Sequence, residues 1–247
     1  MSLPVLALIG LTIIVSSFLS GVFGMAGGMV LLGVLLVFLD VAAAMILFSI
    51  IQFFANGWRA LQWWGYVRWR MFWLYGLGAA VAFAGLRVVE VVPDKALVYL
   101  LLGLMPFVVE IIPASLRPNI EWRGVPFISG VLTTIVQFLA GVGGLFLDLF
   151  FQKSMLDRKT TLATKAVTQA ASHVLRAVYF VSFGSIGDVL GVWPILVAIA
   201  LAIGGTALAP YVIERMTDHG FRQWTRAIIM TVSAIYLVRA GWLYWHG

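Results

Sequence analysis

The sequence predicts an all-α polytopic membrane protein built from two inverted-topology repeats, and three observations lead to this prediction. Of the 247 residues, 62% are hydrophobic and only 11% are charged, with a mean hydropathy of +1.04. Water-soluble domains carry about 25% charged residues, so a large soluble domain is excluded. Apolar segments of membrane-spanning length recur along the whole chain. Finally, the second half of the sequence repeats features of the first half.

A glycine-rich turn marks the repeat. The turn at 24–28, Gly-Met-Ala-Gly-Gly, recurs at 140–144 as Ala-Gly-Val-Gly-Gly, and the pair Leu39-Asp40 recurs as Leu156-Asp157. Transporters are commonly built from two copies of one helical unit around a shared axis. We therefore expect a single transmembrane domain over residues 1–247. It divides into repeat one, residues 1–118, and repeat two, residues 119–247.

The apolar segments, in chain order, cover residues 3–20, 29–39, 41–64, 71–89, 96–112, 125–139, 145–151, 160–183, 190–213 and 224–245. A helix needs about 20 residues to span the hydrocarbon core, and most segments approach that length. Segments 29–39 and 145–151 are shorter, and each follows directly on a glycine turn. Each repeat is therefore expected to hold a glycine-tipped broken or re-entrant helical hairpin plus three spanning helices. The alternative is that the glycines only allow close helix packing.

The Lys and Arg residues indicate the topology. With one hairpin and three spanning helices in each half, eleven of them fall on one side of the membrane and three on the other. Four plain crossings in each half would split them six against eight. The positive-inside rule favours the first arrangement, in which the halves are inverted. Both termini are then expected on the non-cytoplasmic side, and the linker from Pro113 to Pro126 in the cytoplasm.

Two matched polar triplets lie within apolar segments. They are Gln52, Asn56 and Arg59 in repeat one and Gln169, His173 and Arg176 in repeat two. The spacing i, i+4, i+7 places each triplet on one helical face. An arginine at membrane depth is costly, so these side chains are candidates for binding an anion or gating its path. The alternatives are snorkelling of the arginines to lipid headgroups and ordinary interhelical hydrogen bonds.

The glycine tips form a second candidate feature for anion binding. The glycines concerned are Gly24, Gly27 and Gly28 in repeat one and Gly141, Gly143 and Gly144 in repeat two. Helices that begin at these tips would point unpaired backbone N–H groups and positive dipole ends toward the middle of the membrane. Hydroxyl and amide side chains nearby could help, namely Ser16, Ser17, Ser20, Thr133, Thr134 and Gln137. Two such tips facing each other would favour a small anion.

Two further ionisable residues lie within apolar segments of repeat two. Asp148 is in the second short arm, where repeat one has Leu32. It could bind a coupling proton or pair with an arginine. Lys165 shares a helix with His173, but it is near the expected cytoplasmic end, where snorkelling would explain it.

The segment 19–28, Leu-Ser-Gly-Val-Phe-Gly-Met-Ala-Gly-Gly, resembles the first-repeat signature of the sulfite exporter TauE/SafE family, also called the TSUP family. The turn at 141–144 matches it in the second half, and the duplicated architecture fits over essentially the whole chain. The resemblance implies a multi-pass transporter in a bacterial or archaeal-type inner (plasma) membrane. It also implies a small sulfur-containing anion as substrate: sulfite, sulfoacetate or another organosulfonate. Most members of the family export their substrate, and some take it up.

The sequence therefore predicts a secondary transporter that works by alternating access around a central anion site. Export is the expected direction, because an inside-negative potential drives anions outward. The alternatives are a passive anion channel and an uptake permease for a related oxyanion. An enzyme is not expected, since the chain lacks G-x-S, HExxH, P-loop and cysteine motifs. We expect no cofactor, no metal and no nucleic acid, with the anion and membrane lipid as partners; the oligomeric state stays open.

Overall fold

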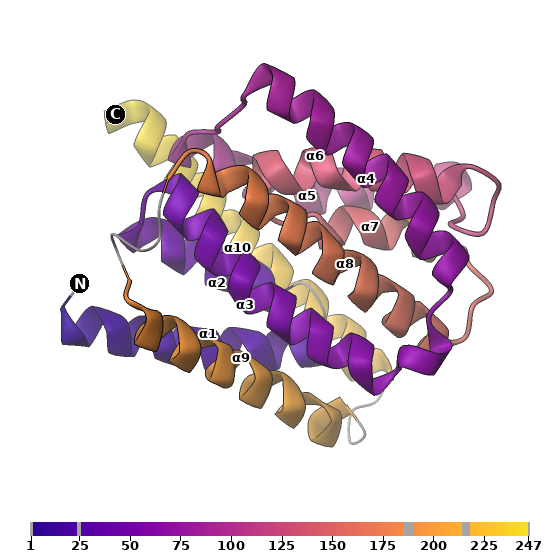
Figure 1. The fold of residues 1–247 in the computed structure, drawn as a ribbon, viewed down its shortest axis with the longest axis horizontal. Coiled ribbons are helices and arrows are strands. Elements are labelled where there is room, and N and C mark those ends of the chain that lie inside the picture. The colour runs from indigo at the N-terminus through magenta and orange to yellow at the C-terminus, as the bar shows by residue number, and fades with distance from the viewer. Residues whose placement is uncertain (1, 24–25, 185–189, 214–217, 247) are drawn as a thin grey trace.

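A computed structural model describes residues 2–23, 26–184, 190–213 and 218–246 (Figure 1). The described residues form ten α-helices and no strands. The helices of the first half are α1 (Leu3–Phe23), α2 (Ala26–Phe38), α3 (Val41–Gln62), α4 (Trp69–Val89) and α5 (Lys95–Ile111). Those of the second half are α6 (Val125–Ala140), α7 (Gly144–Phe151), α8 (Arg158–Val181), α9 (Val192–Ile213) and α10 (Asp218–His246). Short 3-10 helices lie at Trp64–Tyr66 and Ala114–Leu116.

Helix length and hydropathy support a multi-pass membrane protein, as predicted. Five stretches among the described residues are long and apolar enough to cross a bilayer: Leu3–Phe23, Val41–Gln62, Trp69–Val89, Val192–Val212 and Gln223–His246. In contrast, α2 has 13 residues and α7 has 8. At 1.5 Å per residue they extend only about 20 Å and 12 Å, against about 30 Å of hydrocarbon. The two segments predicted to be short arms are therefore short helices.

Helix packing pairs the two halves in a reciprocal way. Helix α1 packs on α9 and α6 packs on α4, while α3 packs on α8 and α5 packs on α10. Exchanging each helix of one half for its counterpart in the other leaves this set of pairs unchanged. Close backbone contacts hold two of the pairs: a Cβ on Gly78 or Gly130 would collide with α6 or α4, and one on Gly205 would collide with α1. Such reciprocity is the pattern that a pseudo-twofold axis produces.

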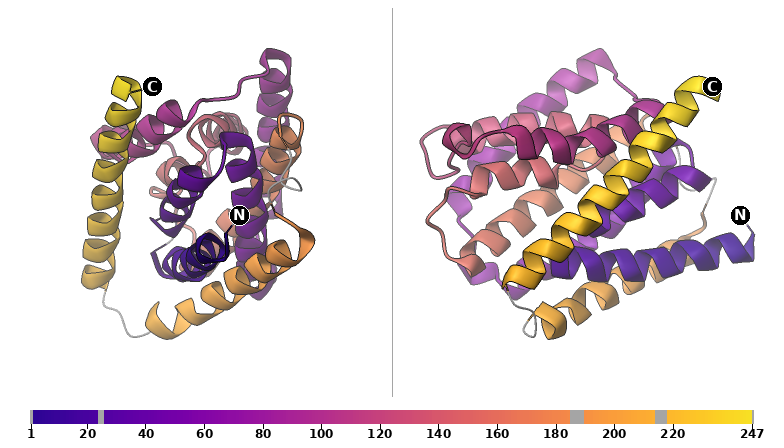
Figure 2. Two further views of the ribbon diagram at one scale, coloured as in Figure 1. Left: turned by 90° about the vertical axis from the view of Figure 1, so that its left-hand side faces the viewer. Right: turned by 180° about the vertical axis from the view of Figure 1, so that it is seen from behind.

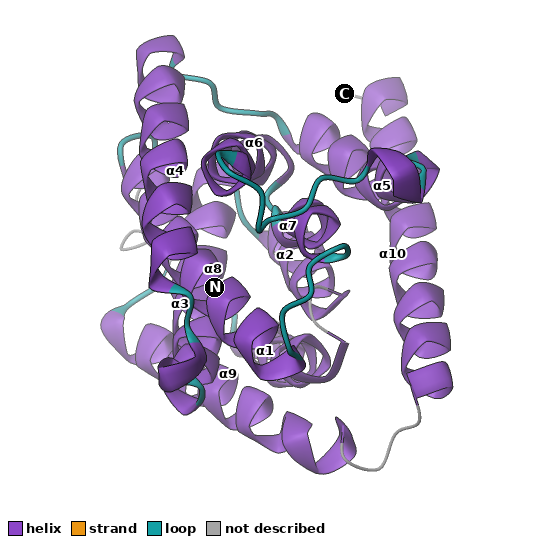
Figure 3. Cartoon of the chain, turned by 90° about the vertical axis from the view of Figure 1, so that its right-hand side faces the viewer, coloured by secondary structure: helices purple, strands orange, loops and turns teal. Residues whose placement is uncertain are grey.

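Each half begins with a helical hairpin, and the two hairpins enter the bundle from opposite ends. In Figure 1, α1 enters from the end where both termini lie, and α2 returns to that end before α3 begins. Helix α6 enters from the other end, where α7 returns to the connection with α8, and Figure 2 shows the same arrangement from behind. Viewed along the bundle, α2 and α7 lie in the middle, surrounded by the longer helices (Figure 3).

Aspartates at matched positions of the two halves cap the starts of α3 and α8. The carboxylate of Asp40 accepts a hydrogen bond from the backbone N–H of Ala43 at the start of α3, and Asp157 does the same for Thr160 at the start of α8. Hydrogen bonds from the Thr160 hydroxyl and N–H lower the pKa of the Asp157 carboxyl. The repeated Leu-Asp pair of the sequence is therefore a helix-start signal.

Helix α8 is central although its sequence is the least apolar of the long helices. It packs against α3 on one side and α4 on the other, and its side chains Ala163, Ala166, Ser172 and Arg176 are buried. Polar residues can occupy this position because the helix faces protein rather than lipid. The packing of α3 against α8 thus brings the two predicted polar triplets into one region.

Candidate functional site

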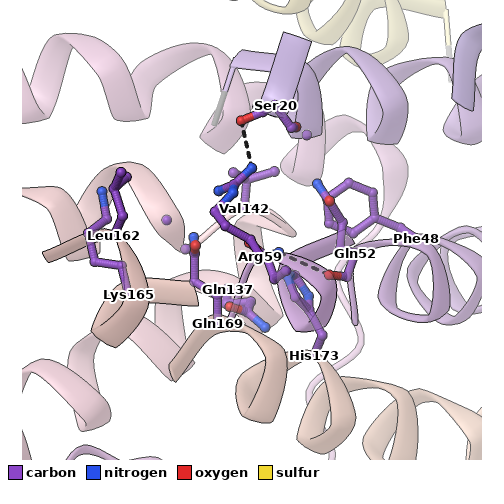
Figure 4. A pocket seen from close by; sticks show the side chains of 14 residues that line it. Ser20, Phe48, Gln52, Arg59, Gln137, Val142, Leu162, Lys165, Gln169 and His173 are labelled. Carbon is purple, nitrogen blue, oxygen red and sulfur yellow. Dashed lines mark hydrogen bonds between the residues drawn. The ribbon is translucent and has the colours of Figure 1, made fainter. Parts of the chain in front are cut away.

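A small cavity, about 60 Å³ in volume, lies between α3, α8 and the tips of the two hairpins (Figure 4). Its lining comes from both halves: Ser20, Gly28, Phe48, Gln52, Asn56, Arg59, Gln137, Val142, Gly143, Gly144, Leu162, Lys165, Gln169 and His173. A water molecule needs about 10–15 Å³ measured in this way. The cavity therefore has room for about four waters or for one small oxyanion.

Most of the predicted site residues line this cavity. They are Gly28, Gln52, Asn56, Arg59, Gly143, Gly144, Gln169 and His173. Three others do not: Gly27 packs against α1, Gly141 offers its carbonyl to Arg176, and Arg176 lies behind the cavity wall. Gly24 lies outside the described residues. The structure thus brings eight residues from distant parts of the sequence around one space.

Glycine is required at the hairpin tips because the helices approach each other closely there. A Cβ on Gly27 would collide with the carbonyl of Ser16 and the N–H of Ser20 in α1. A Cβ on Gly143 would lie 2.9 Å from both the Thr133 carbonyl and the Gln137 Cβ in α6. Gly141 has a left-handed φ of 78°, which favours glycine in the second turn.

The same glycines place two helix N-termini at the cavity. Helix α2 begins at Ala26 and α7 begins at Gly144, and Gly28, Gly143 and Gly144 all line the cavity. The first backbone N–H groups of a helix have no partner within the helix. Together with the helix dipoles, these groups favour negative charge in the space between the two tips.

Arg176 is completely buried, and its guanidinium is fully engaged by neutral partners. Its Nε donates to Ser49 Oγ at 2.8 Å, one terminal nitrogen donates to the Gly141 carbonyl, and the other lies 3.1 Å from His173 Nδ1. The guanidinium carbon lies 4.5 Å from the centre of the Phe48 ring. Snorkelling is therefore wrong for Arg176, which ties α8 to α3 and to the tip of the second hairpin.

Arg59 has a similar role in the first half but remains at the cavity. Its guanidinium donates to the carbonyl of Ser20 in α1 at 3.0 Å, and the side chain is only partly buried (Figure 4). Each arginine of the repeated triplets thus ties its helix to the hairpin of its own half. Because Arg59 lines the cavity, its positive charge is available to a ligand there.

Several neutral groups complete the donor set. Because arginine can only donate, the contact with Arg176 makes His173 Nδ1 an acceptor, so the neutral ring carries its proton on Nε2. The amide of Asn56 donates to the Gln52 carbonyl at 3.0 Å. Gln137 is 2% exposed, and its Nε2 has no hydrogen-bond partner among the described residues. A buried donor without a partner is costly, so an acceptor in the cavity would relieve it.

The structure corrects the expectations for Lys165 and Asp148. Lys165 lines the cavity instead of reaching for the membrane surface, and it forms an ion pair with Asp148 of α7. Asp148 therefore pairs with a lysine, not with an arginine. The cavity lining contains two cationic side chains, Arg59 and Lys165, and no acidic one.

Six lining residues were not among the predicted site residues, and for two of these, Phe48 and Lys165, the repeat carries a signal. Phe48 lies four residues before Gln52, and Lys165 lies four residues before Gln169. They are therefore counterparts one helical turn away from the matched triplets. A search of the two repeats for matching residue types does not find this pair, because Phe48 is aromatic and Lys165 is charged.

The polar lining of this cavity distinguishes it from a larger, apolar hollow on the outside of the bundle. That hollow, about 450 Å³, is lined by apolar side chains of α3, α4, α8 and α9 and the 3-10 helix, such as Phe54, Trp58, Trp64 and Val167. Its lining contains no charged side chain to attract an anion. The described residues also contain no group of three or more potential metal-ligating side chains. The central cavity is thus the candidate site for an anion.

Comparison with known proteins gives one result. A family model described as Sulfite exporter TauE/SafE matches residues 8–237, which include all ten helices in whole or in part. No curated protein and no solved structure matches the chain significantly.

Proposed function

Because the chain belongs to the sulfite exporter TauE/SafE family, we propose that it exports a small sulfur-containing anion, sulfite or an organosulfonate, as a secondary transporter. The family is one of transporters rather than enzymes, and the helices fit a multi-pass membrane protein. The location we propose is an inner (plasma) membrane, where an inside-negative potential favours outward movement of anions.

We place the anion in the cavity between the two hairpin tips. The observation that carries this assignment is the set of donors that converge there without an acidic neighbour in the lining: Arg59, Lys165 and the amide of Gln137, which lacks a partner. The N-termini of α2 and α7 add backbone donors from opposite sides. An oxyanion would accept hydrogen bonds from several of these groups at once, whereas a cation would be repelled.

The cavity volume narrows the choice of anion. Space for about four waters suits a compact inorganic oxyanion such as sulfite. An organosulfonate carries an additional carbon chain, so this conformation would have to widen to admit it. Sulfite is therefore the first substrate to test.

For the mechanism, we propose alternating access between two inverted repeats. The reciprocal helix pairs and the hairpins that enter from opposite ends support this arrangement. Rocking of one half against the other would expose the central site to each side in turn. A passive channel is less well supported, because the cavity is small and is bounded on one side by the buried Phe48 ring, behind which Arg176 packs.

The test is uptake of labelled sulfite into proteoliposomes that are preloaded with unlabelled sulfite. A carrier shows saturable counterflow, and a channel shows no stimulation by internal substrate. Arg59→Gln should abolish at least about nine-tenths of the flux, since a charged hydrogen bond is worth about 1.5–3 kcal/mol. Arg70→Gln removes an exposed arginine at the start of α4 and should leave the flux unchanged. Equal flux from both variants would contradict the proposed site.

A proton gradient tests the coupling. If Asp148 carries a coupling proton, an imposed pH difference will drive sulfite accumulation in the wild type and fail to do so in Asp148→Asn. If the pH difference drives none in the wild type, the membrane potential alone supplies the driving force.

A further inference from the structure

The two sides of the cavity differ in charge at matched positions of the repeats. Lys165 and Asp148 in the second half correspond to Phe48 and Leu32 in the first, four residues from the respective glutamine and glycine. Phe48 and Leu32 are 1% and 0% exposed, and both belong to the core. Lys165 and Asp148 form an ion pair, with side chains 20% and 31% exposed. The matched positions are therefore fully buried and apolar on one side, and partly exposed and charged on the other.

The ion pair lies on the side of the cavity that faces the loop at 152–157. Lys165 is nearer to the start of α8 than Gln169 and His173, and that start follows this loop. In Figure 4, Lys165 and Leu162 lie on one side of the cavity, and Phe48 and Gln52 lie on the other.

Lys165 contacts an acceptor, Asp148, and also faces the cavity, where an anion would be a second acceptor. Its ammonium contacts Asp148 in α7, yet the side chain also forms part of the cavity lining, which Asp148 does not. An anion in the cavity would draw the ammonium away from the carboxylate. Since the charges are partly exposed, the pair is weak enough to be broken by a ligand.

We infer that Asp148 acts as an internal competitor for the transported anion by holding Lys165 when the cavity is empty. The inference rests on the proposed anion site. Asp148 is a positioning residue, because it acts through Lys165 and does not touch the ligand. It lowers the affinity of the cavity for the anion, which allows the anion to dissociate, and it joins α7 to α8 when no anion is bound. The matched positions Phe48 and Leu32 on the apolar side form no such pair.

This arrangement predicts a gain of affinity when the competitor is removed. In Asp148→Asn, Lys165 is released to the cavity, and sulfite should bind up to about fivefold more tightly, the upper end of the range expected for loss of a partly exposed ion pair. Tighter binding slows release, so the maximal counterflow rate should fall together with KM. Lys165→Met should bind sulfite more weakly than the wild type.

The control is Glu110→Gln. This variant makes the same change in net charge and also breaks an ion pair, that of Glu110 with Arg226, but it lies outside the cavity lining. Its sulfite affinity should equal that of the wild type. In the double variant Asp148→Asn/Lys165→Met, the gain should disappear, since the carboxylate acts only through the lysine. Asp148→Glu should retain a wild-type KM.

The measurements are sulfite titrations of the purified protein and KM and maximal rate in counterflow. If wild-type protein neither binds nor exchanges sulfite, the proposed function fails. If the wild type binds but Asp148→Asn equals Glu110→Gln or binds more weakly, the competitor role is wrong and the anion site stands. Asp148→Ser makes the same comparison should the asparagine variant not fold.

Discussion

The two arginines of the repeated triplets occupy matched positions in the sequence and both bond to a hairpin, but only Arg59 lines the cavity. Arg176 is enclosed by Ser49, Gly141, His173 and Phe48, whereas Arg59 is partly buried and lines the cavity. A buried charge that satisfies several protein acceptors stabilises the fold, and an arginine beside a polar cavity can bind a ligand. The burial of each guanidinium decides between these roles.

Replacing these arginines should therefore separate stability from binding. Arg176→Gln leaves the Gly141 carbonyl and Ser49 without their donor, at about 1–3 kcal/mol for each unsatisfied buried group. We expect a clear drop in melting temperature in detergent. Arg59→Gln should melt close to the wild type, with sulfite protection lost. A smaller loss of stability in Arg176→Gln than in Arg59→Gln would contradict this division.

At the scale of the helical hairpin, one glycine has no room for a methyl group and another has space. A Cβ on Gly27 would meet backbone atoms of Ser16 and Ser20, and these cannot move without opening the hairpin. A Cβ on Gly57 in α3 meets nothing within 4 Å. The sequence places Gly27 in a glycine-rich turn and Gly57 within the apolar segment 41–64, and the packing shows that only Gly27 lacks room for a methyl group.

Alanine substitution should show this difference. Gly27→Ala is expected to cost about 1–3 kcal/mol through overpacking and to reduce counterflow, because the tip of α2 moves away from the cavity. Gly57→Ala should be neutral or stabilising by up to about 1 kcal/mol, since alanine favours the helix. Thermal melts and sulfite counterflow of both variants provide the check, and equal melting temperatures would argue against the close approach at Gly27.

The start of α8 depends on the cap at Asp157, and this cap has a pH dependence. Hydrogen bonds from Thr160 hold the pKa of the Asp157 carboxyl below its usual value in the folded protein. The stabilisation is therefore present above the pKa of the unfolded chain and is lost as the pH falls through the lowered folded pKa.

Asp157→Ala should lower the melting temperature at neutral pH, and the difference from the wild type should shrink in acid. Asp157→Asn retains an N-cap acceptor without the charge, so it should lose less stability than alanine at neutral pH. Melting curves from neutral pH to about pH 3 give the comparison. A difference between wild type and alanine that grows on acidification would show that the carboxylate does not cap the helix as described.

On the scale of the whole molecule, the repeat predicted much of the fold and most of the cavity. Some features recur at matched positions in both halves, so they can be recognised directly in the sequence. They are the glycine turns, the capping aspartates and the triplets at 52–59 and 169–176. The inward turn of Arg176 and the pairing of Lys165 with Asp148 depend on helices α3, α7 and α8 packing together. Because Lys165 lies near the start of the apolar segment 160–183, the sequence predicted that its side chain reaches the membrane interface. Only the tertiary structure shows that the side chain faces the cavity.

The loops that carry the predicted cytoplasmic charges gather at one end of the bundle. The loops at 63–68, 112–124 and 152–157 lie at the end opposite both termini (Figure 1), and they carry Arg68, Arg117, Arg123 and Lys153. The positive-inside rule predicts that this end faces the cytoplasm. The partly exposed side of the cavity, with Lys165 and Asp148, would then be the side from which a cytoplasmic anion enters.

Single cysteines can test this orientation because the natural chain has none. Tyr66→Cys and Ser115→Cys place an exposed thiol at the basic end, and Val92→Cys places one in the loop between α4 and α5 at the other. In intact cells, an impermeant thiol reagent should label only Val92→Cys, and permeabilised cells should show labelling of all three. Outside labelling of Tyr66→Cys or Ser115→Cys would reverse the orientation. The lysine–aspartate pair would then face the external medium, and the ion pair would control release from the cell rather than entry.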